Sequence, residues 1–209
     1  MLLGKSDRGV FIPTSIAPDG TAVAGMSGLP AAHDISILTL NDALAGSGGA
    51  VGELREFIAT SFDEGSPVFS PDGRYIAYTS NETGPAEVYV KPYPGPGGAT
   101  LVSRRGGEWP SWNPSGREFF YVSADKKLMV VDVETATTFR AQTPHALFTM
   151  PPFVAGRGTP YDVAADGSCA NRRCPQHSRP SYGSCSTSST SSSAARSSAS
   201  PGPSAIGVR

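Results

Sequence analysis

One short motif recurs three times along this chain. In each copy a Pro-Asp-Gly or Pro-Ser-Gly turn is followed by a run of apolar and β-branched residues. The copies span Ile16–Ser27, Phe69–Ser80 and Trp112–Ser123. Self-similarity at a spacing of roughly 40–50 residues marks a fold that is assembled from copies of one supersecondary unit. The repeat therefore constrains the architecture more than any other feature.

Each copy predicts a β-hairpin. Glycine adopts the positive φ of the turn, proline presets its own φ, and Asp or Ser bonds back to the backbone. Past the turn, the residues at both alternating positions of the next strand are apolar, namely Val23, Ala24, Ile76, Ala77, Phe119 and Phe120. A strand that is apolar on both faces is covered on both faces. This is the pattern expected when sheets stack between two neighbours.

Further strands are expected after each hairpin. The second strands are predicted at Asp34–Leu40, Glu87–Val90 and Lys127–Val133, and weaker outer strands around residues 55–60, 100–103 and 145–148. No segment has a sustained helical period with caps, so the body is predicted to be all-β. We expect a partial β-propeller of about three four-stranded blades plus the start of a fourth at Thr159–Gly167.

The wider spacing between the first two copies predicts an insertion. Residues 41–52, rich in Gly and Ala, are expected to form a flexible surface excursion. Their glycines only approximate a dinucleotide-binding loop, because Val51 stands where the third glycine should be. We therefore assign no phosphate-binding role to this segment.

The motif Phe69–Ser80, followed by Glu87–Gly95, resembles the WD-type β-propeller repeat of TolB. It is most similar to the propellers attached to bacterial serine/threonine protein kinases, and the resemblance covers roughly residues 10–167. It implies a non-catalytic module that binds a protein, peptide or ligand, with any kinase or peptidase activity in a domain outside this chain. The alternative is the lid propeller of a prolyl-oligopeptidase-type serine peptidase. A TolB-like or membrane-kinase parent implies a periplasmic location, and the residues themselves leave the compartment open.

The repeats end abruptly. Three copies and the start of a fourth fall short of the blades of a typical closed ring, so we interpret residues 1–167 as a propeller fragment. Residues 168–209 are rich in serine and carry arginine as their only charged residue type, which predicts a disordered tail. No strand is expected after Gly167, because Ala170 and Arg172 replace the apolar Ile76 and Tyr78 of the second copy. A reading-frame change near Gly167 is our hypothesis, and a natural serine-rich linker is the alternative.

The sequence contains no recognisable catalytic or metal-binding motif. The chain has no Gly-x-Ser-x-Gly elbow, kinase signature, phosphate-binding Gly-Lys loop or His-Glu-x-x-His helix. The three cysteines, Cys169, Cys174 and Cys185, lie in the tail, and their spacing suits no zinc pattern. We therefore expect no catalytic residues, no cofactor and no metal site.

The charge distribution bears on partners. All acidic residues lie within residues 1–167, and the whole chain has a net charge of −1, so no nucleic-acid partner is expected. No segment reaches the roughly 20 apolar residues of a membrane span, so we expect no membrane insertion by this segment. A protein or peptide partner of unknown identity remains the expectation.

A few single residues invite a functional interpretation. His33 is predicted to be a solvated or hydrogen-bonding residue rather than a catalytic base. Trp112 aligns with Phe69 and is predicted to lie in the core. Trp109, with the nearby Arg104 and Arg105, is hypothesised to line a binding face, because aromatic and arginine anchors dominate many interfaces.

Overall fold

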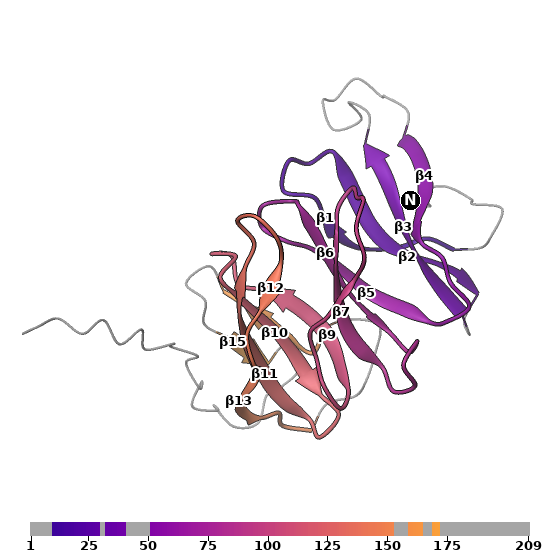
Figure 1. The fold of residues 1–209 in the computed structure, drawn as a ribbon. Coiled ribbons are helices and arrows are strands. Elements are labelled where there is room, and N and C mark those ends of the chain that lie inside the picture. The colour runs from indigo at the N-terminus through magenta and orange to yellow at the C-terminus, as the bar shows by residue number, and fades with distance from the viewer. Residues whose placement is uncertain (1–9, 30–31, 41–50, 153–158, 165–168, 172–209) are drawn as a thin grey trace, which may run out of the picture.

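The computed structural model describes residues 10–29, 32–40, 51–152, 159–164 and 169–171, and every regular element in them is a β-strand (Figure 1). The strands form antiparallel sheets in which consecutive strands pair with each other, except that His145–Thr149 pairs with Lys127–Glu134. This confirms the predicted all-β fold of four-stranded units. We call the three large sheets blades 1, 2 and 3.

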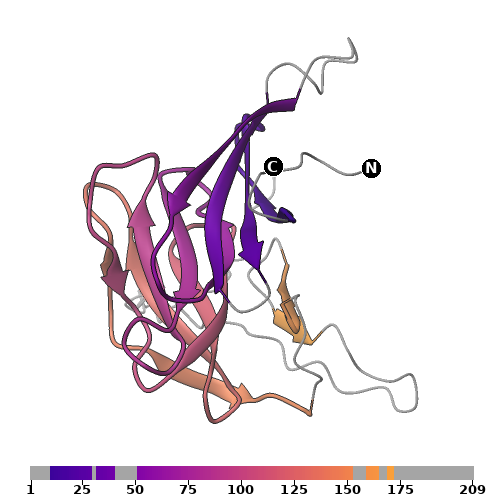
Figure 2. The same cartoon turned by 90° about the vertical axis from the view of Figure 1, so that its right-hand side faces the viewer.

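The strands of each sheet follow one another in chain order. Blade 1 consists of β1 (Ile12–Ile16), β2 (Ala22–Leu29), β3 (Ala32–Leu40) and β4 (Val51–Ile58). Blade 2 consists of β5 (Glu64–Phe69), β6 (Tyr75–Ser80), β7 (Glu87–Pro92) and β8 (Thr100–Leu101). Blade 3 consists of β9 (Gly107–Trp112), β10 (Glu118–Ser123), β11 (Lys127–Glu134), β12 (Arg140–Ala141) and β13 (His145–Thr149). The last sheet is the short pair β14 (Tyr161–Val163) and β15 (Cys169–Asn171), which is separate from the three larger sheets in Figure 2.

The repeated turn has the predicted geometry in all three blades. Gly20, Gly73 and Gly116 have φ values of 73°, 70° and 70°, a region that other residues avoid. In blade 2 the Ser70 amide donates to the Tyr75 carbonyl (2.9 Å), which closes the hairpin. The turn thus sets the register of the strand that follows it.

The blades stack through the two faces of their second strands. Ile76 packs toward blade 1 with Ala24, and Phe119 packs toward blade 2 with Ala77. The next residue of β10, Phe120, turns to the opposite face and packs with Tyr161 of β14. Both faces of the strand are therefore covered, as the apolar pattern predicts.

One predicted boundary is wrong, and blade 3 has one strand more than predicted. Val51 and Gly52 belong to β4 rather than to the insertion, because β4 continues along β3 as far as the pairing of Leu40 with Val51. The other insertion residues, 41–50, lie outside the described residues. In blade 3 the outer position is shared by two strands, since β12 pairs with one end of β11 and β13 with the other.

The expectation that no strand follows Gly167 is also wrong. β15 pairs antiparallel with β14, and Ala170 lies opposite Asp162. A ladder of backbone hydrogen bonds does not require apolar side chains, so weak apolar character did not prevent a short strand. Residues 172–209 lie outside the described residues, and so the disorder and reading-frame hypotheses stay predictions.

Candidate functional site

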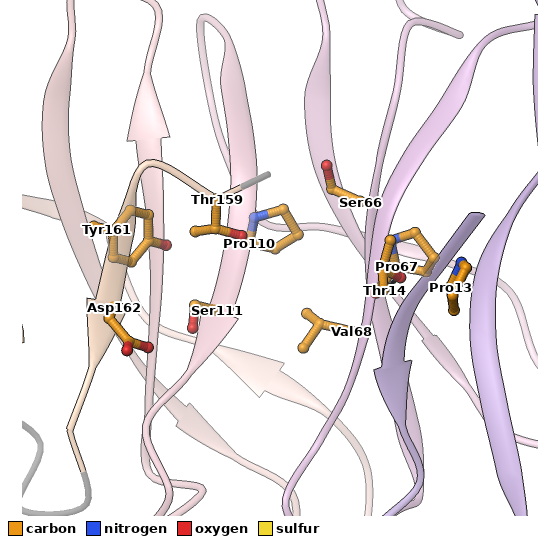
Figure 3. A pocket seen from close by; sticks show the side chains of 10 residues that line it. All are labelled: Pro13, Thr14, Ser66, Pro67, Val68, Pro110, Ser111, Thr159, Tyr161 and Asp162. Carbon is orange, nitrogen blue, oxygen red and sulfur yellow. Dashed lines mark hydrogen bonds between the residues drawn. The ribbon is translucent and has the colours of Figure 1, made fainter. Parts of the chain in front are cut away.

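A cavity of about 330 Å³ opens where the first strands of the four sheets meet (Figure 3). We call it the central cavity. Its lining residues come from β1, β5, β9, β14 and the short segment before β14: Pro13, Thr14, Ser66, Pro67, Val68, Pro110, Ser111, Thr159, Tyr161 and Asp162. The first strands of successive sheets thus surround one space, which is the arrangement of propeller blades around their axis.

The first strands of the three blades are irregular where they line this cavity. The register of β1 shifts between Pro13 and Ser15, and that of β5 between Gly65 and Val68. In β9 the shift lies between Glu108 and Ser111. Such β-bulges re-aim side chains and are frequent next to functional sites. Here they turn the middle of each first strand toward the cavity.

Two of the bulges contain strained residues. Ser66 and Trp109 have positive φ values of 49° and 54°, which non-glycine residues rarely adopt. Each directly precedes a proline that lines the cavity, Pro67 or Pro110. The same strained backbone conformation occurs at corresponding positions of two blades. This indicates that the cavity wall requires that conformation.

The prolines set the hydrogen-bonding character of the wall. Proline has no backbone N–H, so it is confined to edge strands and bulges of a sheet. Pro13, Pro67 and Pro110 remove three donors from the strands that face the cavity, and they oppose pairing with an added strand. The wall therefore offers hydroxyl groups, carbonyl groups and one carboxylate.

Side chains tie each first strand to the next around the cavity. The Thr14 hydroxyl of blade 1 donates to the Pro67 carbonyl of blade 2 (2.7 Å). The Tyr161 hydroxyl of β14 donates to the Trp109 carbonyl of blade 3 (2.7 Å). Between these ties, Nε1 of Trp112 in blade 3 reaches the Val68 carbonyl of blade 2 (3.4 Å). The acceptors lie in or beside the bulges, so these bonds hold the irregular segments in place.

The chemistry of the lining suits binding. Its ionisable side chains are Tyr161, whose hydroxyl is engaged with blade 3, and Asp162, whose Oδ1 accepts the Val163 amide (3.1 Å). Within the part of the chain that the structure describes, no group of three or more His, Cys, Asp or Glu side chains could hold a metal ion. In the same residues, no helix is long and apolar enough to cross a membrane.

The residues of the hypothesised binding face differ in exposure. Trp109 is buried, with 6% of its surface exposed, in the cluster between blade 3 and β14. The Lys126 ammonium lies over its ring at 5.6 Å. Arg104 and Arg105 are exposed in the turn before β9. The indole cannot share a free surface with the arginines, because burial against its neighbours covers it, and a binding role for the arginines stays a prediction.

His33 takes a structural position. It lies within β3 rather than in the loop before the strand, and its Nδ1 lies 2.9 Å from Oδ1 of Asp63. The Asp63 carboxylate also accepts the His33 backbone amide (2.9 Å). This pair ties blade 1 to the segment that leads into blade 2.

Sequence reasoning missed the central cavity. The available signal was a proline in or just before the first strand of every sheet: Pro13, Pro67, Pro110 and Pro160. A proline repeated within segments that otherwise predict strands indicates an edge or a bulge. The four proline-containing segments could therefore have been expected to be irregular, and in the structure they surround the central cavity.

No family model matches the chain, and no curated protein matches it. Among solved structures it is similar to a putative TolB from Agrobacterium tumefaciens, with 18% identity and a TM-score of 0.49, over 68% of this chain and 52% of that one. TolB from Acinetobacter baumannii has 14% identity and a TM-score of 0.43, over 66% and 34%. The periplasmic gluconolactonase PpgL from Pseudomonas aeruginosa has 18% identity and a TM-score of 0.47, over 77% and 50%. The chain thus spans about half or less of the length of each of these proteins.

Proposed function

We propose that this chain is a non-catalytic β-propeller module that binds a protein or peptide partner at the central cavity. The observation that carries the proposal is the enclosure of one cavity by the bulged first strands of successive sheets. Rigid sheets that hold irregular segments in place suit recognition, because a preorganised site loses little entropy on binding. The short hydroxyl side chains of the wall suit hydrogen bonding to a polar ligand.

The parent protein is a finer part of this proposal. The repeat motif Phe69–Ser80 resembles the propellers attached to bacterial serine/threonine kinases, which favours a sensor or scaffold module for such an enzyme. The lid propeller of a prolyl-oligopeptidase-type peptidase is the alternative. A kinase domain encoded upstream in frame supports the first parent, and a hydrolase domain downstream supports the second.

The binding site can be tested with a peptide that binds the full chain and that is selected from a displayed peptide library. Ser111→Phe fills the cavity from β9 and Thr159→Phe fills it from the segment before β14. Each is expected to weaken the selected peptide's affinity at least about tenfold by fluorescence anisotropy. The double variant Arg104→Ala/Arg105→Ala tests the competing binding face in the turn before β9, where both side chains are exposed. Thr100→Val, on an exposed position of β8, is the control and is expected to leave the affinity unchanged.

The opposite pattern contradicts the proposal. If the arginine variant loses binding while both cavity variants keep it, the partner docks at the turn before β9 instead. Far-ultraviolet circular dichroism of every variant separates lost binding from lost folding. Failure to select any peptide at micromolar affinity also counts against a peptide-binding role.

A further inference from the structure

Glu64 occupies an unusual place in the contact between blades 1 and 2. It begins β5, is only 1% exposed, and lies opposite Ser80 of β6, which in turn lies opposite Glu87 of β7. Residues opposite one another in a sheet share a face. Tyr78, two residues before Ser80, packs on blade 1 with Ile35. Glu64 therefore faces blade 1.

The two glutamates of this row differ in how their oxygens are satisfied. Both oxygens of Glu87 have donors, since Oε2 accepts the Ser103 hydroxyl and Oε1 accepts the Gly106 amide (2.8 Å). In Glu64, Oε1 accepts the Thr60 hydroxyl (2.5 Å) and lies 3.4 Å from the Ser80 hydroxyl. Its Oε2 is buried and has no hydrogen-bond partner. A buried charged oxygen without a partner is strongly unfavourable, and a protonated carboxyl group avoids that charge.

The surroundings of Glu64 also oppose a negative charge. Burial raises its pKa, the hydrogen bonds from Thr60 and Ser80 lower it, and the Asp34 carboxylate of β3 raises it, so that the net direction is upward. Other charged or titratable groups on the elements packed here are His33 of β3, Asp63 before β5, Tyr78 of β6 and Glu82 after β6, together with Glu87 and Tyr89 of β7 and Glu53, Arg55 and Glu56 of β4. His33 is engaged with Asp63 rather than with Glu64.

We propose that Glu64 is a proton-controlled joint between blades 1 and 2: its side chain is neutral while the blades are closed together, and its ionisation loosens their contact. The proposal is independent of what the central cavity binds. Neutral Glu64 can keep its second oxygen buried in this contact, which also contains Ile35, Ile58, Tyr78 and Tyr89. An ionised Glu64 needs water or a donor at Oε2, and the contact must open to supply either.

The sign of the pH dependence follows from linkage. The pKa of Glu64 in the folded protein lies above its usual value of 4.5. The stabilisation from the neutral form is therefore complete below about pH 4.5 and is lost as the pH rises through the folded-state pKa. Between these two pKa values, the equilibrium for opening the contact grows by up to about tenfold per pH unit, and above the folded-state pKa it levels off.

Hydrogen exchange of the full chain at pH 5 and pH 8, corrected for the intrinsic exchange rate, tests this joint. In the wild type, protection of β5 is expected to be lower at pH 8 than at pH 5, while protection of β10 in blade 3 stays the same. Glu64→Gln is expected to keep the pH 5 protection of β5 at both pH values, because an amide cannot ionise. Glu87→Gln, the matched buried control, is expected to lower protection at both pH values alike.

Two results would overturn the proposal. One is equal protection of β5 in the wild type at the two pH values. The other is a Glu64→Gln variant that keeps the wild-type pH dependence. Urea unfolding at both pH values adds a second measure: the ratio of unfolding constants between Glu64→Gln and wild type must change with pH, and a constant ratio means that Glu64 has only a packing role.

Discussion

The contact between blades 2 and 3 differs in composition from the contact between blades 1 and 2. The first contains aromatic and β-branched side chains from both blades, among them Tyr75, Val88, Trp112 and Phe119. The second has two parts. In one, Phe69 and Ile76 of blade 2 meet a mainly small-residue surface of blade 1: Ala17, Ala22, Ala24 and Ile37. In the other, Tyr78 and Tyr89 of blade 2 pack with Ile35 and Ile58 of blade 1. Both blades thus contribute buried aromatic rings to the contact between blades 2 and 3, whereas in the contact between blades 1 and 2 the buried aromatic rings come from blade 2.

This difference indicates which contact between blades opens first. Burial of apolar surface contributes roughly 25 cal/mol per Å², so alanines contribute less than aromatic rings do. The blade 1–2 contact also holds the unpartnered oxygen of Glu64. We therefore expect blade 1 to separate from blade 2 before blade 2 separates from blade 3, as a local opening below the free energy of global unfolding.

The largest expected effect comes from truncation at the aromatic contact. Trp112 packs edge-on against Phe119 with ring centroids 5.0 Å apart, and Trp112→Ala is expected to cost about 3–5 kcal/mol of unfolding free energy. Its counterpart in blade 1, Ile16, is 62% exposed, so Ile16→Ala is expected to change stability by less than about 0.5 kcal/mol. Urea denaturation of both variants gives the comparison. Equal losses would show that the two positions are packed alike.

A smaller effect is expected from the tie between blades 1 and 2. Thr14→Val keeps the shape of the side chain but removes the hydroxyl that donates to the Pro67 carbonyl, which is expected to cost about 0.5–1.5 kcal/mol. The loss should appear as faster hydrogen exchange in β1 and β5, with β10 unaffected. Thr100→Val, on an exposed position of β8, is the control. If Thr14→Val is as stable as this control, the Thr14 hydroxyl does not stabilise the contact between blades 1 and 2.

The smallest effect is a pH dependence in the blade 2 turn. Partial burial raises the pKa of Asp72, but hydrogen bonds from the Ser70 hydroxyl, the Arg74 amide and the Arg74 guanidinium lower it below its usual value in total. The resulting stabilisation is present above about pH 4 and is lost as the pH falls through the folded-state pKa. Asp72→Asn should thus be less stable than wild type at pH 7, with the difference shrinking toward pH 3 in urea titrations. A difference that is constant with pH would mean that the charge has no role.

The hairpin repeat was readable from the sequence because it depends on local chemistry. Gly73 and Gly116 require a positive φ, and the residues after them alternate between two covered faces. These signals lie within about ten residues of one another, so the turn, the register and the stacking could be predicted together. The boundary of β4 was not predictable in this way, because it depends on how far β3 offers a partner across an intervening segment.

The central cavity and the Glu64 contact depend on neighbours distant in sequence. Trp109 precedes a proline at a bulge, and its aromatic side chain suggested a binding face, but Tyr161 and β14 cover it from more than forty residues away. Likewise, nothing near Glu64 in the sequence indicates that its second oxygen lacks a donor. Side-chain chemistry of this kind is decided by which blade packs next to which.

The most direct test of the account is a nuclear Overhauser measurement of side-chain contacts between blades. The Phe57 and Tyr93 rings of blades 1 and 2 have centroids 5.6 Å apart, as do the Tyr75 and Phe139 rings of blades 2 and 3. Cross-peaks within both pairs, and between Tyr161 and the residues around Trp109, are the predicted result. Cross-peaks confined to strands within each sheet, with none between sheets, would contradict the stacking on which the central cavity depends.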